Sequence, residues 1–242
     1  MIALYHGGPN GYSASLLIAL AEKGLAYEDH PLDLAAFAQH APDFLAVNPG
    51  GQVPVLREDG RTLTEAFFTL LYLDERYPDP PLGGADPQAR YTVQKWGKYV
   101  ETHIAPNLAI VDWAARGQTP DDAARAGFER LPAERRALWE QALEGFSAEE
   151  VQAARAALAK AADRIGEDLT GSGWLAGDAW SLADIIVFPH AARFAALGIT
   201  VPATIADWLE RAGRRPAVRQ ALGAQGLVAA PATMGPERGR WG

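Results

Sequence analysis

Short apolar runs and amphipathic stretches alternate along the first third of the chain. Ile2 to Tyr5 is an apolar run that ends at two glycines and a proline, and apolar residues then recur at helical spacing up to a stop at Gly24. Continued along the chain, the pattern predicts strand, helix, strand, helix, strand, strand and helix over residues 2–5, 13–24, 27–32, 35–47, 53–56, 61–63 and 65–77. We therefore expect a small α/β domain with a parallel crossover in its first half and an antiparallel hairpin, turning at Asp59-Gly60, in its second half.

The pattern changes after a break that is rich in proline and glycine, at Asp79-Pro80-Pro81 and Gly83-Gly84. Beyond it, apolar positions recur at helical spacing with no convincing hairpin between them, over residues 88–115, 121–145, 147–168, 181–197 and 204–213. We expect a second, all-helical domain. The predicted division is an α/β domain over 1–80, a linker over 81–88, a helical domain over 89–222, and a tail over 223–242 that is mobile or drapes over the surface.

One polar motif in the helical part has a sufficient structural explanation. Ser181-Leu182-Ala183-Asp184 has the spacing of a capping box, with Asp at the third helical position where Glu or Gln is usual. We expect this serine and this aspartate to cap the N-terminus of a helix.

Composition excludes several kinds of chemistry. The 242 residues include no cysteine, so disulfides, thiolate metal sites and a cysteine nucleophile are absent, and any thiol chemistry must use the sulfur of a substrate or cofactor. The five histidines show no ligand spacing, and we expect no metal site. A net charge of −8 argues against nucleic-acid binding. No apolar stretch approaches the roughly 18 residues of a membrane span, and we expect a cytoplasmic protein.

The glycine-rich segment Gly7-Gly8-Pro9-Asn10-Gly11 lies between a predicted strand and a predicted helix, where a phosphate-binding loop would sit. It lacks the G-x-G-x-x-G spacing, and no further βαβ units follow residue 87, so a dinucleotide-binding fold is disfavoured. Ser13 follows at the start of the first helix. Its hydroxyl and the helix dipole together favour a bound anion, although a plain helix N-cap is the structural alternative.

Pro54 stands at the start of a strand that should otherwise pair, in the segment from Asn48 to Leu56. Proline cannot donate to a strand ladder. If the Val53-Pro54 bond is cis, the backbone N–H and C=O of Val53 can point outward and pair with an extended, peptide-like ligand. The alternative is an edge-strand proline in a plain turn.

Glu65 lies eleven residues after Pro54, at the start of a predicted helix. A ligand carboxylate could meet the backbone N–H groups of that helix start while Glu65 holds a neighbouring ammonium, and a zwitterionic amino-acid end fits such a pair. The alternative is that Glu65 only complements the helix dipole.

The chain resembles the cytosolic glutathione transferase superfamily in these residues. The resemblance rests on the segments 48–54 and 64–65 and on the Gly177-Asp178-Ala179-Trp180-Ser181-Leu182-Ala183-Asp184 signature, and it implies a thioredoxin-like N-terminal domain followed by a helical C-terminal domain. Further similarity to the bacterial β-aryl etherases of lignin breakdown lies in Leu4-Tyr5 through Ser13, in residues 22–25, in Gln39-His40 and in a lengthened helical segment over 135–151.

The resemblance implies a cis Pro54 and a glutathione site. In that site Ser13 faces the sulfur and is the catalytic residue, and Tyr5 is its rival as activator. The residues expected to bind glutathione are Gln39 and His40 near the glycyl carboxylate, Gln52, Val53 against the cysteinyl backbone, Pro54, Glu65 at the γ-glutamyl ammonium, and Ala66.

Two positions depart from the family's pattern. Ala66 stands where a serine is usual, so one hydroxyl to the γ-glutamyl carboxylate is missing, and Tyr12 stands where the β-aryl etherases that the chain resembles have asparagine. The first departure lowers the expected affinity for glutathione, and the second affects the details of catalysis.

The reaction needs glutathione as its thiolate, because the thiol is a poor nucleophile with an ordinary pKa of about 8.5. A hydroxyl donor and a helix N-terminus could lower that pKa by a unit or two. The thiolate would then attack the β-carbon of an α-keto β-aryl ether and displace a phenolate, with positioning and thiolate stabilisation as the main sources of catalysis.

The electrophile is expected in a cleft between the two domains. Tyr12, Tyr99, His103 and Trp113 are the candidate substrate-binding residues, although aromatic residues at helical spacing are more often core than pocket.

Two other functions stay open at this point. One is a glutathione transferase acting on another electrophile, such as a halide, an epoxide or an isothiocyanate. The other is a non-catalytic binding or assembly protein, for which Ala66 is the one hint in the sequence. By family resemblance we expect a homodimer, with a heterodimer as the alternative.

Overall fold

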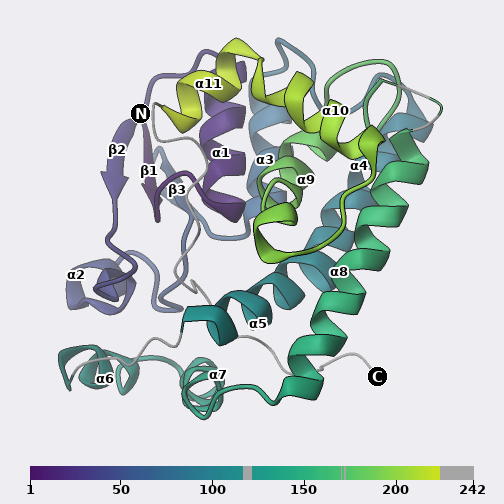
Figure 1. Cartoon of the computed structure of the whole chain (residues 1–242). Helices are drawn as coiled ribbons and strands as arrows, with labels where there is room; N and C mark the ends of the chain where they lie inside the picture. Colours follow the sequence, from purple (N-terminus) through teal and green to yellow (C-terminus); the bar gives the residue numbers. More distant parts are fainter. Residues whose placement is uncertain (117–121, 170, 172, 224–242) are drawn as a thin grey trace.

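The computed structural model describes residues 1–116, 122–169, 171 and 173–223. It contains an α/β part around a small sheet and a larger helical part beside it, and both termini of the described chain contribute to the α/β side (Figure 1). The predicted tail over 223–242 lies, apart from Gly223, outside the described residues. The two-domain arrangement agrees with the expectation from sequence, whereas the precise domain bounds stay a prediction.

A mixed four-stranded sheet forms the centre of the first domain. Its strands are β1 (Ile2–His6), β2 (Glu28–Pro31), β3 (Val55–Glu58) and β4 (Arg61–Leu63), in the spatial order β2-β1-β3-β4. β1 pairs with β2 in parallel and with β3 in antiparallel orientation, and β3 pairs with β4 in antiparallel orientation. Both the parallel crossover and the final hairpin were predicted correctly.

The hairpin turn uses the residues that its geometry requires. Asp59 and Gly60 have φ values of 49° and 82°, and a two-residue turn with both φ values positive matches the right-handed twist of the flanking strands. Asp tolerates this left-handed region better than most residues, and Gly adopts it without steric cost.

Helix α1 (Gly11–Glu22) begins two residues before its predicted start. Asn10 is its N-cap residue, so the alternative role of Ser13 as the N-cap is wrong. The predicted stop at Gly24 is confirmed: Gly24 has a φ of 61°, its N–H donates to the carbonyl of Ala21, and the N–H of Leu25 donates to that of Leu20. This pair of bonds is a Schellman motif, which favours glycine at that position.

The prediction of a single helix over 35–47 was wrong. The chain instead forms a short 3-10 turn, η1 (Ala38–His40), and one helical turn, α2 (Pro42–Leu45). Phe37 has a positive φ of 54°, which is incompatible with a continuous helix. Ala41 has the extended ψ of 146° that a following proline imposes, so Pro42 ends the first turn and begins the second.

Helix α3 (Ala66–Arg76) completes the first domain, and the connection that follows it is anchored at Lys23. The buried Lys23 ammonium donates to Asp74 at 2.5 Å and to the carbonyls of Tyr77 and Pro80 at 2.7 Å each. The backbone N–H of Leu82 donates to the same Asp74 carboxylate. The proline- and glycine-rich break is therefore held firmly against the end of α1.

The second domain is built from helices in its described residues, as predicted, apart from loops and an isolated β-bridge between Trp174 and Gly177. Its elements are α4 (Pro87–Tyr99), a π-helical turn η2 (Val100–Ile104), α5 (Ala105–Arg116), α6 (Asp122–Phe128), α7 (Ala133–Leu143), α8 (Ala148–Leu169), α9 (Leu182–Ala191), η3 (Ala195–Leu197), α10 (Ala203–Gly213) and α11 (Pro216–Leu222). Helix α11 was not predicted. It is short, begins with a proline at its first position, and packs against α1 of the first domain.

One hydrophobic core runs through both domains. Helix α1 packs against α3 of its own domain on one side and against α9 and α11 on the other (Figure 1). The core includes Leu4 and Leu56 of the sheet together with Trp96 and Trp208 of the helical domain, all fully buried. The two domains are thus positioned relative to each other by buried apolar surface.

The capping box predicted at Ser181 is confirmed. The Ser181 hydroxyl accepts from the backbone of Ala183 at 3.2 Å, and the Asp184 carboxylate accepts from the backbone of Ser181 at 3.0 Å. Asp184 also accepts from the indole N–H of Trp208 and from the backbone of Leu175. Burial raises the pKa of Asp184 to about 6, although its hydrogen-bond donors oppose that shift.

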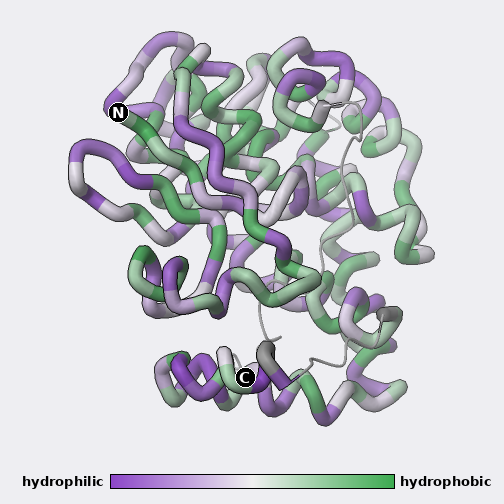
Figure 2. Tube along the Cα trace, turned by 90° about the vertical axis from the view of Figure 1, so that its left-hand side faces the viewer, coloured by the Kyte–Doolittle hydropathy of each residue, from purple (hydrophilic) through white to green (hydrophobic). Residues whose placement is uncertain are grey.

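Helices α6 and α7 form a separate layer below the sheet and α2 (Figure 1), and the same layer lies at the lower end of the molecule in the turned view of Figure 2. A second hydrophobic cluster holds this layer in place. It joins the first domain to α5, α6 and α7 through Phe37, Trp113, Phe128, Leu131, Trp139 and Ala142. Among the described helices, none is both long and apolar enough to cross a membrane.

Candidate functional site

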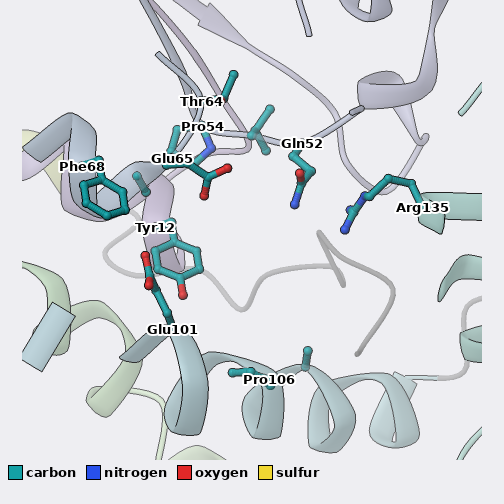
Figure 3. A pocket seen from close by; sticks show the side chains of 12 residues that line it. Tyr12, Gln52, Pro54, Thr64, Glu65, Phe68, Glu101, Pro106 and Arg135 are labelled. Atoms are coloured by element: carbon teal, nitrogen blue, oxygen red, sulfur yellow. The ribbon is translucent and has the colours of Figure 1, made fainter. Parts of the chain in front are cut away.

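A cleft of about 410 Å³ opens between the two domains (Figure 3). The first domain supplies the N-terminal turn of α1, the segment before β3 and the start of α3, and the second domain supplies η2, α5 and α7. The lining residues are Tyr12, Gln52, Val53, Pro54, Thr64, Glu65, Ala66, Phe68, Glu101, Pro106, Ala109 and Arg135. Five of the residues predicted to bind glutathione, together with Tyr12, thus lie around one cavity.

Asn48 shapes the segment that carries Val53 to the cleft. Its side-chain amide donates to the carbonyl of Gln52 at 2.9 Å, and its side-chain oxygen accepts from the backbone of Gly50 at 3.0 Å. Gly51 has a φ of 62°, and a Cβ there would lie 2.9 Å from the His40 ring, so the position needs glycine for both backbone and space. The local motif therefore holds a tight turn directly before the cleft wall.

The Val53–Pro54 peptide bond is cis, as the resemblance implies. The pairing of β3 with β1 extends from Glu58 to Val55, so Val53 lies two residues outside the paired register. Val53 and Pro54 both line the cleft. Val53 and Pro54 therefore form a segment outside the sheet pairing that borders the cleft.

Glu65 occupies the N-cap position of α3, but its side chain makes no capping hydrogen bond. The side chain is exposed and its carboxylate points into the cleft (Figure 3). Ala66 is the first helical residue, so the unpaired N–H groups of the helix start lie beside that carboxylate. The arrangement combines an anion-binding helix end with a carboxylate suited to a cation.

Tyr12 and Ser13 occupy the first turn of α1 but differ in their surroundings. Tyr12 lines the cleft, and its ring meets the ring of buried His190 edge-on, with 4.9 Å between centroids. Ser13 is 2% exposed and is not among the lining residues; its hydroxyl oxygen accepts from the backbone N–H of Gly7 at 3.2 Å. Ser13 is thus buried next to Tyr12 in the chain and does not itself line the cleft.

His6 organises the loop before α1. The backbone N–H of Gly8 donates to His6 Nδ1 at 3.0 Å, so Nε2 carries the ring hydrogen and donates to Asp29 at 2.7 Å. Tyr5, the rival activator, lies elsewhere: its ring stacks on His30 with 4.4 Å between centroids, and it is not among the residues that line the cleft.

Gln39 and His40 do not line the cleft; they belong to η1, which packs against α6. Both are buried, and both side-chain polar atoms of each residue have no hydrogen-bond partner in the described structure. The His40 ring packs against Phe128 and Trp139, with centroids 5.2 and 5.1 Å away. Burial, with a smaller contribution from the charge of Arg135, lowers the pKa of His40 to about 4, so its ring is neutral near pH 7.

Three of the predicted substrate-binding residues lie outside the cleft. Tyr99 and His103 stack on each other, with ring centroids 4.5 Å apart, and the guanidinium of Arg164 on α8 covers the Tyr99 ring. Trp113 is buried in the second hydrophobic cluster beside Trp139. These three residues thus occupy other faces than the cleft-lining one: Trp113 is buried in the core, Tyr99 is half-buried and His103 is exposed.

Sequence reasoning missed the lining residues Phe68, Glu101, Pro106, Ala109 and Arg135. Glu101 is half-buried in η2, two residues from Tyr99 and therefore on a different face of the same helix. Burial raises the pKa of Glu101, Lys98 opposes that shift, and nearby Glu65 adds to it. No local pattern in the sequence distinguishes this cleft-facing charge from a solvated one.

Within the described residues, no group of three or more His, Asp or Glu side chains is arranged to hold a metal ion.

Comparison with known proteins gives two family matches. Residues 1–75 match the glutathione S-transferase N-terminal domain, and residues 148–223 match the glutathione S-transferase C-terminal domain. Maleylacetoacetate isomerase of Rhizobium meliloti is 36% identical over 142 residues, which cover 53% of this chain and 67% of that protein.

Protein LigF of Sphingobium sp. strain SYK-6 is similar over nearly the whole chain. The two sequences are 29% identical over 236 residues, covering 90% of this chain and 92% of LigF. The crystal structure of LigF, described as a β-etherase, superposes with a TM-score of 0.83 and covers 91% of this chain and 98% of its own. A glutathione transferase homologue from Sulfitobacter with bound glutathione superposes with a TM-score of 0.72 at 25% identity, covering 94% of this chain and 99% of its own.

Proposed function

This chain belongs to the glutathione S-transferase family, and on that premise we propose that it is a glutathione transferase of the β-etherase type. The thiolate of glutathione attacks an electrophilic carbon of a lignin-derived aromatic ketone and cleaves its β-aryl ether bond. The main support for the proposal is that Val53, Glu65 and the first turn of α1 line the same cleft.

The first domain supplies groups that complement glutathione. Val53 lies outside the paired register of β3, which supports pairing of its backbone with the cysteinyl residue of the ligand. Glu65 points into the cleft without a capping bond and is assigned the γ-glutamyl ammonium. The backbone N–H of Ala66 is assigned the γ-glutamyl carboxylate, and Gln52 and Pro54 line the wall beside them.

Ser13 is assigned the activation of the sulfur. Its hydroxyl oxygen already accepts a hydrogen bond from Gly7, which leaves its hydrogen to be donated to a thiolate. The N-terminus of α1 adds a positive partial charge at the same place. Both effects favour the anion, so the pKa of the bound thiol falls and no general base is required.

The reaction is then a displacement at carbon. A bond forms between the sulfur and the β-carbon, the bond from that carbon to the aryl oxygen breaks, and its electron pair leaves on the phenolate, which takes a proton from water. The products are a glutathione thioether and a phenol. Positioning of thiolate and carbon, with stabilisation of the sulfur anion, supplies most of the rate enhancement.

The rest of the cleft suits an aromatic electrophile. Tyr12, Phe68, Pro106 and Ala109 present apolar surface there, and Phe68 is 64% exposed in the unliganded chain. An aromatic substrate would cover this surface. The β-etherase description of LigF, at 29% identity, is the second support for an aryl ether as substrate.

The test is turnover of a β-aryl ether ketone in the presence of glutathione. We expect the thioether and the free phenol to form in equal amounts, as measured by chromatography with mass detection. Formation of neither product, with turnover of a model aryl halide, an epoxide or an isothiocyanate instead, would replace the etherase assignment by a general transferase.

Calorimetry separates both enzymes from a non-catalytic protein. A glutathione transferase binds glutathione, whereas failure to bind it would favour a binding or assembly role, for which Ala66 is the structural hint. We also propose a cytoplasmic location and a homodimer, with a heterodimer as the alternative; light scattering of the purified chain tests the assembly.

A further inference from the structure

Asn10 stands at the N-cap position of α1, but its side chain does not cap the helix. Asparagine is among the residues that most favour this position, because its side-chain oxygen can accept from a backbone N–H of the first turn. The Asn10 side chain makes no such hydrogen bond, although the residue is buried. Its amide donates instead to the carbonyl of Gly7 at 2.5 Å. The side chain therefore holds the loop before the helix.

The start of α1 stays open as a result. The first intrahelical bond runs from the N–H of Ala14 to the carbonyl of Asn10 at 3.0 Å, so the N–H groups of Gly11 and Ser13 precede the hydrogen-bond ladder. A capping side chain would bond the N–H of the second or third helical residue, and Ser13 is the third. A bound anion can use the N–H of Ser13 only while the Asn10 side chain stays on Gly7.

The loop that Asn10 holds also orients the Ser13 hydroxyl. Gly7 donates its N–H to Ser13 Oγ at 3.2 Å and accepts from the Asn10 amide through its carbonyl. The N–H of Asn10 donates to the carbonyl of Gly8 at 2.9 Å, and the N–H of Gly8 donates to buried His6. Two consecutive glycines have wide conformational freedom, so such contacts are needed to keep the loop in one conformation. Asn10 supplies two of them.

We propose that Asn10 is a positioning residue for the sulfur of glutathione: its side chain bonds Gly7 and so leaves both the N–H and the hydroxyl of Ser13 to the thiolate. The inference rests on the proposed function and deepens it. Tyr12, on the same turn, lines the cleft, which places the helix start beside the ligand (Figure 3). The neutral amide matters as well as its contact, because a negative charge at this position would repel the thiolate.

Asn10→Asp separates this role from a purely structural one. Aspartate has nearly the same shape, but its carboxylate cannot donate to Gly7 and is a strong N-cap that would accept from the N–H of Ser13. The helix thus gains a cap, whereas the sulfur loses a donor and gains a neighbouring negative charge. Both changes disfavour the thiolate, so the pKa of the bound thiol should rise by about one unit or more.

Ultraviolet absorbance of the full-length chain saturated with glutathione, recorded as a function of pH, measures the pKa of the bound thiol. We expect the upward shift in Asn10→Asp together with a thermal midpoint at or above that of the wild type. S-Methylglutathione has no thiol to ionise, so calorimetry should give both proteins the same affinity for it within about threefold. Asn10→Ala, which adds neither a cap nor a charge, should raise the thiol pKa by less than Asn10→Asp does.

Asn107→Asp is the matched control, because the Asn107 amide also donates to a backbone carbonyl, that of His103 at 2.7 Å. It adds the same charge to the chain and should leave the thiol pKa unchanged.

Three results would overturn the inference alone. They are an unshifted thiol pKa in Asn10→Asp, an equal shift in Asn107→Asp or Asn10→Ala, and a lower thermal midpoint of Asn10→Asp with weakened binding of S-methylglutathione, which indicates a damaged loop. Absence of glutathione binding by the wild type, or binding without thiolate absorbance, would overturn the proposed function with it.

Discussion

The hydroxyl oxygen of Ser13 accepts a hydrogen bond from the backbone N–H of Gly7 at 3.2 Å. The bond ties the first turn of α1 to the loop that follows β1, and it orients the hydroxyl with its hydrogen left for another acceptor. Tyr12, the preceding residue, lines the cleft. The proposed action of Ser13 on a bound sulfur rests on this position in the first turn of α1 and on that free hydrogen.

Ser13→Ala should raise the pKa of the bound glutathione thiol by about one unit, because the thiolate loses a hydrogen-bond donor. The rate at pH 6.5 should then fall by about tenfold, with a smaller deficit above pH 9. The pH profile of kcat/KM and the ultraviolet absorbance of the bound thiolate measure both effects. Ser15→Ala is the control, since the Ser15 hydroxyl donates to the carbonyl of Gly11 on the same helix. An unchanged profile in Ser13→Ala would remove Ser13 from the mechanism.

Glu65→Gln should weaken glutathione binding by about 10- to 100-fold, because the ligand's ammonium loses its charged partner. A glutathione analogue without the α-amino group should bind the variant and the wild type equally. Glu75→Gln, which removes an exposed carboxylate from the same helix, should change neither affinity. Equal weakening for both ligands in Glu65→Gln would instead indicate damage to the helix start.

Ala66→Ser should strengthen glutathione binding by about three- to tenfold, since the added hydroxyl supplies the missing donor to the γ-glutamyl carboxylate. Ala66 is partly exposed at the first position of α3, so a hydroxyl fits there without overpacking the core. Calorimetry measures the affinity, and the thermal midpoint of the free protein checks that the fold is unaffected. A weaker or unaltered affinity would mean that the ligand's carboxylate does not approach this position.

Acid should destabilise the chain through His190. Burial lowers the pKa of His190 from 6.5 to about 4, so below pH 6.5 the unfolded state binds a proton that the folded state does not. Above pH 6.5 the free energy of unfolding does not depend on the protonation of this group. It decreases as the pH falls from 6.5 towards 4, and the decrease reaches about 2 kcal/mol at pH 5.

The comparison of His190→Gln with the wild type isolates that contribution, because both proteins keep His40 and Asp184. Urea unfolding at pH 7.5 and at pH 5 gives the two free energies of unfolding. The drop in free energy between these pH values should be about 2 kcal/mol smaller in the variant. An identical drop in both proteins would contradict the assignment.

Some elements of the fold follow from neighbouring residues alone. The turn at Asp59-Gly60 and the capping box at Ser181 were predicted because each depends on residues within a few positions of one another. The break at Pro42 also has a local cause, because proline favours an extended preceding residue, and this preference overrides the helical pattern predicted over 35–47.

In the candidate site, too, some residues could be predicted from local sequence patterns and others could not. The segments around Val53 and Glu65 were found because each carries a chemically specific motif in consecutive residues. Tyr99 and Trp113 were selected for their size at helical spacing, and that spacing is shared by faces that pack against α8 or α7. Glu101 and Arg135 were missed because no local pattern distinguishes a cleft-facing charge from a solvated one.

The types of most elements, the absence of a cysteine thiol and the motifs of the first domain can be read from the amino-acid sequence, since these depend on composition and on residues close in the chain. Long-range packing determines which faces of η2 and α5 line the cleft, that α11 packs against α1, and that α7 brings Arg135 to the same cleft as Gln52. Whether a side chain faces the core or a cavity depends on which distant element packs against its own helix or strand. The burial of apolar surface between these elements determines that packing.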